Sequence, residues 1–288
     1  MITKFFNGKV FAKDILFDIC KKSNIYCINY YMKPCLSIFL IGNVFSTNLY
    51  VKNKIIGCNK VNINFFIFKF SKTVKLNTLI MIIKMLNVDI KINAILIQKP
   101  LPLKLDNIHL FDSINYAKDV DLLSSKSFGK YILGYYKGIS SCTSQAILYC
   151  LNEINVKLKG LKIVIFGYSN IVGKPLCYDL LYCGASVSII NKNDKNFSIL
   201  SQLADILIIA IGVPHFLSSN LISFGSIIID VGINCNKKNN IIGDVDINSI
   251  FGTASWITPV PGGIGPITVS MLLLNTLRLY FYQRDYLI

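Results

Sequence analysis

The chain has 288 residues, of which 53% are hydrophobic, a length that suits one large or two ordinary domains. Its apolar runs are strand-length, none reaches the roughly 18–20 residues of a membrane span, and lysines interrupt its first residues, so we expect a cytoplasmic protein without a membrane segment or signal peptide. The net charge of +15 comes from lysines scattered among Asn and Ile, without a basic helix, and does not predict a specific nucleic-acid partner.

Helix-like and strand-like segments alternate through the first half of the chain. The pattern predicts a helix over 9–22, a strand over 35–41, a helix over 47–59, a strand over 62–68, a helix over 78–86 and a strand over 94–98. Strands that alternate with helices favour a mostly parallel sheet covered on both faces.

The second half continues the alternation. It predicts a helix over 144–152, a strand over 162–166, a helix from 173 to about 183, a strand over 186–190, a helix over 197–203 and strands over 205–210 and 226–231. A Pro/Gly loop over 258–268 and an apolar helix over 269–279 follow. The whole chain therefore indicates an α/β fold.

Nine cysteines and two histidines limit the chemistry that this chain can carry. The cysteines form no C-x-x-C pair and fall mostly in apolar segments, which favours reduced, buried thiols over a disulfide framework. His109 and His215 lie in different segments, so we expect neither a metal site nor a His-centred triad.

A strand, then Gly167, then Gly173 where the next helix opens, outlines a dinucleotide-binding turn. Ser169 stands where the usual fingerprint has its central glycine. NAD sites usually carry an acidic residue at the end of the following strand, whereas Asn191 and Lys192 suit the 2′-phosphate of NADP. Lys192 taken alone is equally explained as a solvated side chain.

Four residues of the first half form a second candidate group. Tyr50 and Lys54 are spaced to share one face of a helix. A lysine in a cleft has a lowered pKa and can exchange protons, although Lys54 taken alone would be an ordinary surface lysine. Gln98, at a strand end, can hold a polar partner in place, and Asp121 is a carboxylate suited to the donor edge of a heterocycle.

The 258–268 loop reads T-P-V-P-G-G-I-G-P-I-T and is the most informative run of the chain. Its prolines fix φ, and its glycines allow positive φ and the close approach of another molecule. A rigid turn between two elements is the simpler interpretation of such a composition, and ligand binding is the alternative.

Seven runs together resemble motifs of the bifunctional methylenetetrahydrofolate dehydrogenase/cyclohydrolase family, in the family's order and over essentially the whole chain. They are Tyr50-Val51-x-x-Lys54, Gln98-x-Pro100-Leu101-Pro102, Asp119-Val120-Asp121, Gly167-x-Ser169-Asn170-Ile171-Val172-Gly173-x-Pro175, Asp230-Val231-Gly232-Ile233-Asn234, Gly243-Asp244-Val245 and the 258–268 loop.

The resemblance implies two α/β domains with a cleft between them: an N-terminal folate-side catalytic domain (1–121 plus 269–288) and a Rossmann-like NADP-binding domain (122–268). It implies NADP-dependent oxidation of 5,10-methylenetetrahydrofolate, then hydrolysis of the methenyl product to 10-formyltetrahydrofolate, in the one-carbon metabolism that serves purine biosynthesis. A homodimer is also implied by the family.

Residue roles follow from the same resemblance. Lys54 resembles the catalytic lysine and Tyr50 the residue that packs against the folate ring system. Gln98 resembles the hydrogen-bond partner of the lysine, and Asp121 resembles the pterin anchor. The NADP contacts implied are Gly167, Tyr168, Ser169, Gly173, Asn191, Lys192 and Ile233, and the further folate contacts are Pro261, Gly262 and Gly263.

The chain departs from the family pattern at several positions. Leu122-Leu123-Ser124-Ser125 replaces Gly-Phe/Leu-His-Pro after Asp121, and Ser141 and Ser144 replace prolines. Tyr168 stands where Arg is common, and Lys99 replaces an apolar residue. None of these removes a proposed catalytic group. Two other classes of protein stay open on the residues alone: another NADP-dependent oxidoreductase with the same two domains, and a basic nucleic-acid-binding protein.

Overall fold

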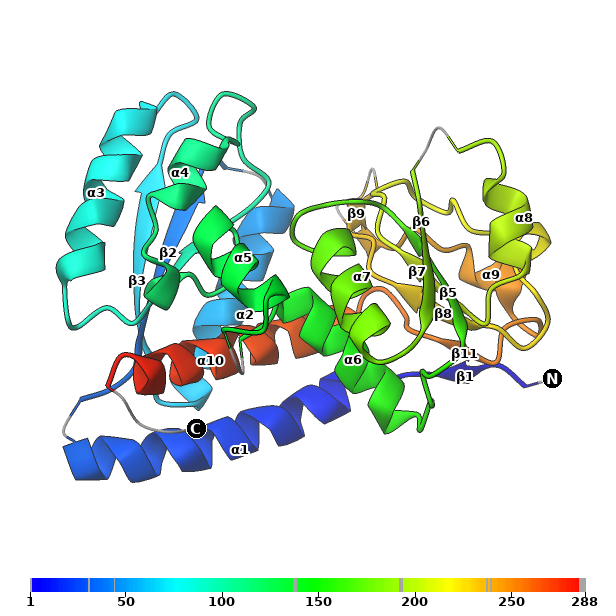
Figure 1. Cartoon of the computed structure of the whole chain (residues 1–288), viewed down its shortest axis with the longest axis horizontal. Coiled ribbons are helices and arrows are strands. Elements are labelled where there is room, and N and C mark those ends of the chain that lie inside the picture. The colour runs from blue at the N-terminus through cyan, green and yellow to red at the C-terminus, as the bar shows by residue number, and fades with distance from the viewer. Residues whose placement is uncertain are drawn as a thin grey trace. The chain divides into compact units, whose positions relative to one another are not determined.

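The strand over 35–41 is the longest fully buried strand, and it organises one of two compact units into which the chain divides. The computed structural model (Figure 1) describes residues 2–30, 32–43, 45–136, 139–191, 194–236, 238 and 240–284. The first unit comprises Met1–Ala12 and Thr143–Thr268, and the second comprises Lys13–Cys142 and Val269–Ile288.

The second unit contains a three-stranded parallel sheet. Its elements are β2 (Cys35–Ile41), α2 (Phe45–Lys60), β3 (Asn64–Phe70), α3 (Leu76–Val88), β4 (Ala94–Ile97), α4 (Ile108–Asp112), the 3₁₀ turn η1 (Tyr116–Lys118) and α5 (Ser125–Ile132). The strand order is β3-β2-β4, so the apolar β2 lies in the middle and both sets of its alternating side chains are buried. One set, including Phe39, packs against Leu79 and Ile83 of α3.

The first unit contains a six-stranded parallel sheet of order β1-β11-β8-β7-β5-β6. Its elements are β1 (Lys4–Phe5), α6 (Cys142–Glu153), β5 (Lys162–Phe166), α7 (Gly173–Tyr182), β6 (Ser186–Ile190), α8 (Phe197–Gln202), β7 (Ile206–Ile209), the 3₁₀ turn η2 (Ser219–Leu221), β8 (Ile227–Asp230), the β9–β10 hairpin (Asn234–Cys235 and Ile241–Ile242), α9 (Ile247–Ile250) and β11 (Trp256–Ile257). The helix α1 (Gly8–Tyr30) and the helix α10 (Ile264–Tyr282) contribute residues to both units. The predicted α/β fold with parallel sheets is confirmed.

The structure differs from the expected domain boundaries in two segments. Residues 1–12 join the first unit because β1 pairs with β11, with Lys4 N donating to Ser255 O at 2.9 Å and Phe6 N to Ile257 O at 2.9 Å. Residues 122–142 join the second unit, where Leu123 N and Ser124 N donate to the Asp119 carboxylate at 3.1 and 2.7 Å.

The last helix begins earlier than the sequence pattern predicts. α10 starts at Ile264 instead of 269, so the end of the Pro/Gly loop is helical. Pro266 is compatible with this because amide donors in a first helical turn have no intrahelical partner, and a missing one costs nothing there. By length and composition, α10 could also cross a bilayer, but 72% of its apolar window is buried inside the structure.

The described cysteines are free thiols. Cys35, Cys58, Cys142 and Cys150 are buried as expected, whereas Cys183 and Cys235 are exposed, and the side chain of Cys27 lies outside the described residues.

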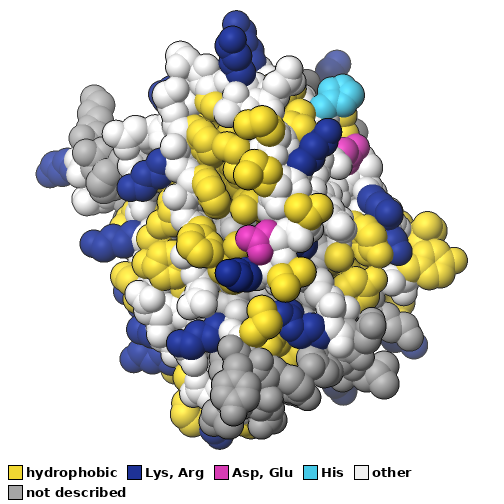
Figure 2. All heavy atoms as spheres, turned by 90° about the vertical axis from the view of Figure 1, so that its left-hand side faces the viewer, with side chains coloured by type: hydrophobic (Ala, Val, Ile, Leu, Met, Phe, Trp, Pro, Cys, Tyr) yellow, Lys and Arg dark blue, Asp and Glu magenta, His cyan; other side chains and the backbone are white. Residues whose placement is uncertain are grey.

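α3 has one apolar face in the core and a second at the surface. Leu79, Ile83 and Leu86 are buried at helical spacing, while Met81 and Met85 are exposed. The space-filling view of this side of the molecule shows apolar side chains gathered between scattered lysines (Figure 2).

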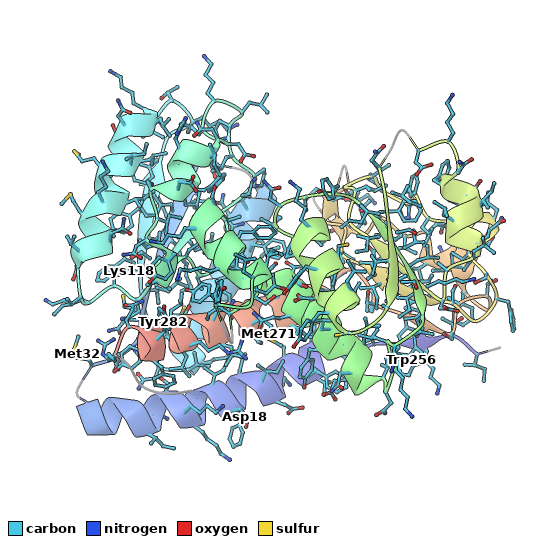
Figure 3. All side chains as sticks on the ribbon, in the orientation of Figure 1. Asp18, Met32, Lys118, Trp256, Met271 and Tyr282 are labelled. Carbon is cyan, nitrogen blue, oxygen red and sulfur yellow. The ribbon has the colours of Figure 1, made fainter. Side chains whose placement is uncertain are left out.

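The C-terminal end of α3 is closed by a buried cation. Lys118, which is 6% exposed, donates from Nζ to Leu86 O at 2.8 Å and to Asp89 O at 2.7 Å (Figure 3). These carbonyls have no partner within the helix, and a cation at a helix C-terminus also complements the helix dipole. Because Lys118 directly precedes the Asp119-Val120-Asp121 run, this contact fixes the start of that run against α3.

We expect Lys118→Met to lower the free energy of unfolding by about 2 kcal/mol, because it leaves two carbonyl acceptors without a charged donor. Urea denaturation of the full chain measures this, with Lys84→Met on the exposed side of α3 as the matched control. Equal free energies of unfolding for the two variants would contradict the capping role.

Candidate functional site

Lys54 and Gln98 form a direct hydrogen bond inside the second unit. Lys54, on α2, is 9% exposed, and its Nζ donates to Gln98 Oε1 at 2.6 Å. Gln98 directly follows β4, and its Nε2 donates to Lys99 O at 2.7 Å while its backbone N donates to Phe39 O at 3.0 Å. The amide is therefore held with its oxygen towards the lysine.

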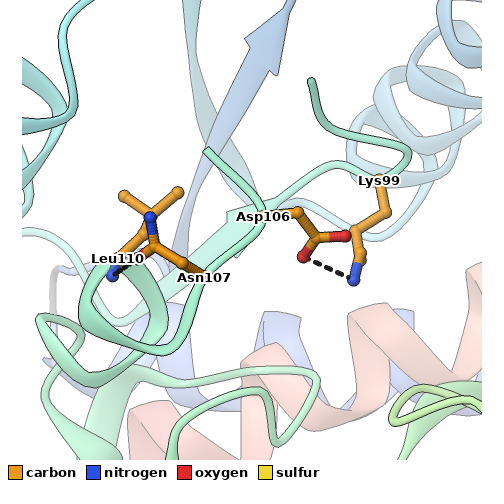
Figure 4. A network of polar contacts seen from close by, with 4 residues as sticks. All are labelled: Lys99, Asp106, Asn107 and Leu110. Carbon is orange, nitrogen blue, oxygen red and sulfur yellow. Dashed lines mark hydrogen bonds and ion pairs between the residues drawn. The ribbon is translucent and has the colours of Figure 1, made fainter. Parts of the chain in front are cut away.

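The loop after Gln98 is pinned by local contacts (Figure 4). Lys99 Nζ forms an ion pair with Asp106 Oδ1 at 2.9 Å, and Asn107 caps α4 by accepting from Leu110 N at 3.2 Å. Lys99, one of the departures from the family pattern, thus has a partner of its own within this loop and leaves Gln98 free to face Lys54.

Asp121 enters the same group from the segment before α5. Its Oδ1 accepts from Cys142 N at 3.1 Å, at the start of α6, and its charge acts on Lys54. Asp119 shapes this segment from the other side, since its buried carboxylate accepts from Ser127 Oγ and from two backbone amides. Leu122 has φ of 55°, the left-handed region that favours the glycine of the family pattern.

Burial moves the pKa values of Lys54 and Asp121 in opposite directions. Desolvation lowers the pKa of Lys54, while Asp121, Cys142 and Cys58 oppose that shift. Desolvation raises the pKa of Asp121, opposed by the Cys142 amide and by Lys54. Both shifts favour neutral forms, so Lys54 can gain and lose a proton closer to neutral pH than a solvated lysine.

Tyr50 lies on α2, one turn before Lys54, and is half-buried. The helical spacing places the two residues on the same side of α2. The structure thus gathers Lys54, Gln98 and Asp121 in the second unit, with Tyr50 beside the lysine.

Three residues of this unit escaped the sequence interpretation: Cys142, Asp119 as a shaping residue, and Asn275 on α10. Cys142 supplies its backbone amide, and burial raises the pKa of its thiol well above the ordinary value, so it stays protonated. The only sequence signal was the Asp-x-Asp run, which marks two carboxylates in one short segment but does not show which donors each of them meets.

In the first unit, Gly167 and Gly173 build a turn that has no room for side chains. Gly167 follows β5 with φ of 115°, and a Cβ on it would lie 2.4 Å from Ala210 O. A Cβ on Gly173 would lie 2.0 Å from Gly167 O. Ser169 Oγ accepts from Val172 N at 3.1 Å and closes the turn before α7.

The N-terminus of α7 has the properties of an anion site. Its N-cap residue, Val172, offers no side-chain hydrogen bond. Lys174 N donates to Ser169 O at 3.1 Å and Pro175 has no amide hydrogen, so the Gly173 amide is the donor of the first turn that remains for a ligand. Lys174 adds a cation and lies over the ring of the exposed Tyr168 at 4.8 Å from its centroid. The turn fits the pyrophosphate of a dinucleotide. Lys174 was not singled out from the sequence.

Two of the other predicted cofactor residues follow strands of the same sheet. Asn191 follows β6 and is exposed, and Ile233, which is 44% exposed, lies beyond β8. Lys192 lies outside the described residues.

Two carboxylates hold the segments around Ile233. Asp230 accepts from Gly232 N at 2.9 Å and from Val245 N at 3.1 Å, and Asp244 Oδ2 accepts from Gly212 N at 2.9 Å. Burial raises the pKa of Asp230 to about 6. The described residues contain no group of three or more His, Cys, Asp or Glu side chains that could hold a metal ion.

Pro261, Gly262 and Gly263 belong to the first unit, whereas Lys54 belongs to the second. Gly262 has φ of 112°, and Gly263 N donates to Pro259 O at 2.7 Å. A Cβ on Gly8 would lie 1.8 Å from Gly263 O, so α1 begins in close contact with this loop.

Comparison with known proteins identifies relatives along the whole chain. A family model described as the tetrahydrofolate dehydrogenase/cyclohydrolase catalytic domain matches residues 6–121, and its NAD(P)-binding counterpart matches residues 141–284. The bifunctional protein FolD of Mycoplasma capricolum is 41% identical over 275 residues, which cover 95% of this chain and 96% of that protein.

Solved structures give the same result. The bifunctional FolD methylenetetrahydrofolate dehydrogenase/cyclohydrolase of Campylobacter jejuni has a TM-score of 0.92 and 33% identity, covering 98% of this chain and 99% of that one. The Trypanosoma brucei enzyme, solved with NADP and an inhibitor, has a TM-score of 0.94 and 26% identity, covering 99% of each chain.

We expect Gly173→Ala to weaken NADP binding at least about tenfold, because its methyl group would displace the backbone of the turn. Calorimetric titration with NADP measures this. Gly129→Ala in α5 is the matched control, since a Cβ there meets nothing within 4 Å, and it should raise stability by roughly 0.5–1 kcal/mol. NADP affinity that is unchanged in Gly173→Ala would remove this turn from the cofactor site.

Proposed function

The chain belongs to the tetrahydrofolate dehydrogenase/cyclohydrolase family, and on that premise we propose that Lys54, Gln98, Asp121 and Tyr50 carry its folate chemistry. The enzyme oxidises 5,10-methylenetetrahydrofolate with NADP and hydrolyses the methenyl product to 10-formyltetrahydrofolate. The observation that carries the assignment is the buried hydrogen bond between Lys54 Nζ and Gln98 Oε1, within the electrostatic reach of Asp121.

The oxidation step requires little proton transfer to or from the protein's acids and bases. Bound NADP supplies the hydride acceptor, and the residues proposed to hold it are Gly167, Tyr168, Ser169, Gly173, Asn191, Lys192 and Ile233. The donor is the methylene carbon of the folate, and loss of hydride leaves a methenyl cation stabilised by its two nitrogens. Tyr50 packs against the folate ring system, and Asp121 accepts hydrogen bonds from its amino and N–H groups. Pro261, Gly262 and Gly263 complete the folate contacts.

The hydrolysis step moves protons. Water adds to the methenyl carbon, and a proton must leave that water before the carbon–nitrogen bond opens. Neutral Lys54 accepts this proton and then returns one to the departing ring nitrogen. Gln98 Oε1 accepts a hydrogen bond from Lys54 in either protonation state, so the amine keeps its position through the cycle.

We infer three further properties from the family: a cytoplasmic location, a homodimer and supply of 10-formyltetrahydrofolate to purine biosynthesis. A continuous absorbance assay tests the central activity. It follows NADP reduction with 5,10-methylenetetrahydrofolate and then the decay of methenyl absorbance. Absence of either signal would overturn the bifunctional assignment.

We expect Lys54→Met to reduce cyclohydrolase activity at least about a hundredfold while part of the dehydrogenase activity survives, because only hydrolysis needs the exchangeable proton. The methenyl intermediate should accumulate in stopped-flow absorbance. Lys52→Met, on the exposed side of α2, is the control and should behave as the unmodified enzyme. Decay of the intermediate at the unmodified rate in Lys54→Met would limit Lys54 to a binding role.

We expect Asp121→Ala to weaken tetrahydrofolate binding by roughly 1.5–3 kcal/mol, because donors of the ring lose a charged acceptor, and to leave NADP affinity intact. Isothermal calorimetry with each ligand measures this. Asp106→Ala removes a carboxylate from a partly exposed ion pair in the same unit and should change neither affinity. Unchanged folate affinity in Asp121→Ala would contradict its role as the pterin anchor.

A further inference from the structure

Asn275, on α10, is fully buried and ties together the two chain segments that hold Asp121. Its Nδ2 donates to Val120 O at 3.1 Å and to Ser140 O at 2.8 Å, and lies 3.6 Å from Cys142 Sγ. Val120 directly precedes Asp121, and Ser140 precedes the Cys142 amide that donates to the Asp121 carboxylate.

The chemistry of the amide suits this task. A side-chain amide nitrogen carries two N–H donors, and here each has a backbone carbonyl. Arg278 donates to Asn275 Oδ1 at 3.4 Å, which fixes the amide with its nitrogen towards the two carbonyls. The two segments are therefore held at one spacing by one rigid group on a buried helix.

We propose that Asn275 is a positioning residue for Asp121: by clamping Val120 and Ser140, it holds the carboxylate against the Cys142 amide in the geometry that the folate ring requires. The inference rests on the proposed function, since it gives Asp121 its assigned role. Asn275 itself does not touch the reacting atoms.

Displacement of Asp121 also alters the electrostatics at Lys54. The titratable groups that act on Lys54 are Asp121, Cys142 and Cys58, and Gln98 is its neutral partner. Asp121 is the first of the groups that keep the pKa of Lys54 from falling further under desolvation. A displaced carboxylate therefore shifts the rising limb of the cyclohydrolase pH profile to lower pH, because hydrolysis needs neutral Lys54.

The experiment uses the full chain with Asn275→Leu, which keeps a similar volume without donors, and Asn275→Ser, which keeps one donor. Thr276→Val is the matched control, because Thr276 is equally buried on α10 and its hydroxyl donates only within the helix, to Leu272 O at 2.9 Å. The measurements are the dissociation constants for tetrahydrofolate and NADP and the pH profile of methenyl hydrolysis.

We expect Asn275→Leu to weaken tetrahydrofolate binding about tenfold. The affinity of Asn275→Ser for tetrahydrofolate should lie between those of Asn275→Leu and the unmodified enzyme. NADP affinity should stay within about twofold in both, which also reports that the protein is folded, and the rising limb should move to lower pH. Thr276→Val should change neither folate affinity nor the limb.

Three results would overturn the proposal. If Asp121→Ala weakens folate binding but the Asn275 variants keep the unmodified affinity and pH limb, Asn275 has no positioning role and the proposed function stands. If Asp121→Ala also leaves folate binding unchanged, the assignment of Asp121 fails and the inference fails with it. Equal losses for folate and NADP in both Asn275 variants would show a general structural role and would likewise overturn it.

Discussion

The burial of the Lys54 amine is the constraint around which polar groups of the second unit are arranged. Lys54 is almost completely removed from water, and its direct side-chain partner is the neutral oxygen of Gln98. A buried cation without a direct ion pair is costly, and the cost falls when the group is neutral. The same desolvation lowers the pKa of Lys54 towards the range in which a lysine exchanges protons, which is the property that its proposed role in hydrolysis needs.

The two carboxylates of the Asp119-Val120-Asp121 run have different partners and different roles. Asp119 is saturated by donors of the protein itself, from the backbone and from Ser127, and it shapes the turn before α5. Asp121 accepts from Cys142 N and keeps further acceptor capacity for a ligand. Val120 lies between them with its side chain fully buried, and the chain turns after Asp119, so the two carboxylates meet different donors.

Much of the fold follows from the sequence because apolar runs bounded by Gly, Pro or Asp mark buried parallel strands, as at β2, β5 and β7. The apolar pattern did not predict the shortest strands. β1 and β11 span two residues each, too short for any period, and their pairing depends on chain segments far apart in sequence. β3 spans 64–70 instead of the predicted 62–68, because it pairs with β2 from Asn64 opposite Cys35 to Phe70 opposite Ile41.

The site was predictable only where a motif carried it. Lys54, Gln98 and Asp121 could be chosen because their runs resemble a family, and the structure gathers them. Asn275 could not, since a polar residue within an apolar helix gives no indication of which carbonyls it meets. The family also removes the alternative of an unrelated NADP-dependent oxidoreductase.

The contrast between buried and exposed thiols has a practical consequence for labelling. Cys142 is buried beside Asp121 with its thiol held protonated, because burial raises its pKa, whereas Cys183 and Cys235 lie open to solvent in the first unit. Maleimide dyes react with accessible thiolates and so discriminate against Cys142. A fluorophore can therefore be attached to the nucleotide-binding unit of the native sequence, and its emission can report ligand binding without an engineered cysteine.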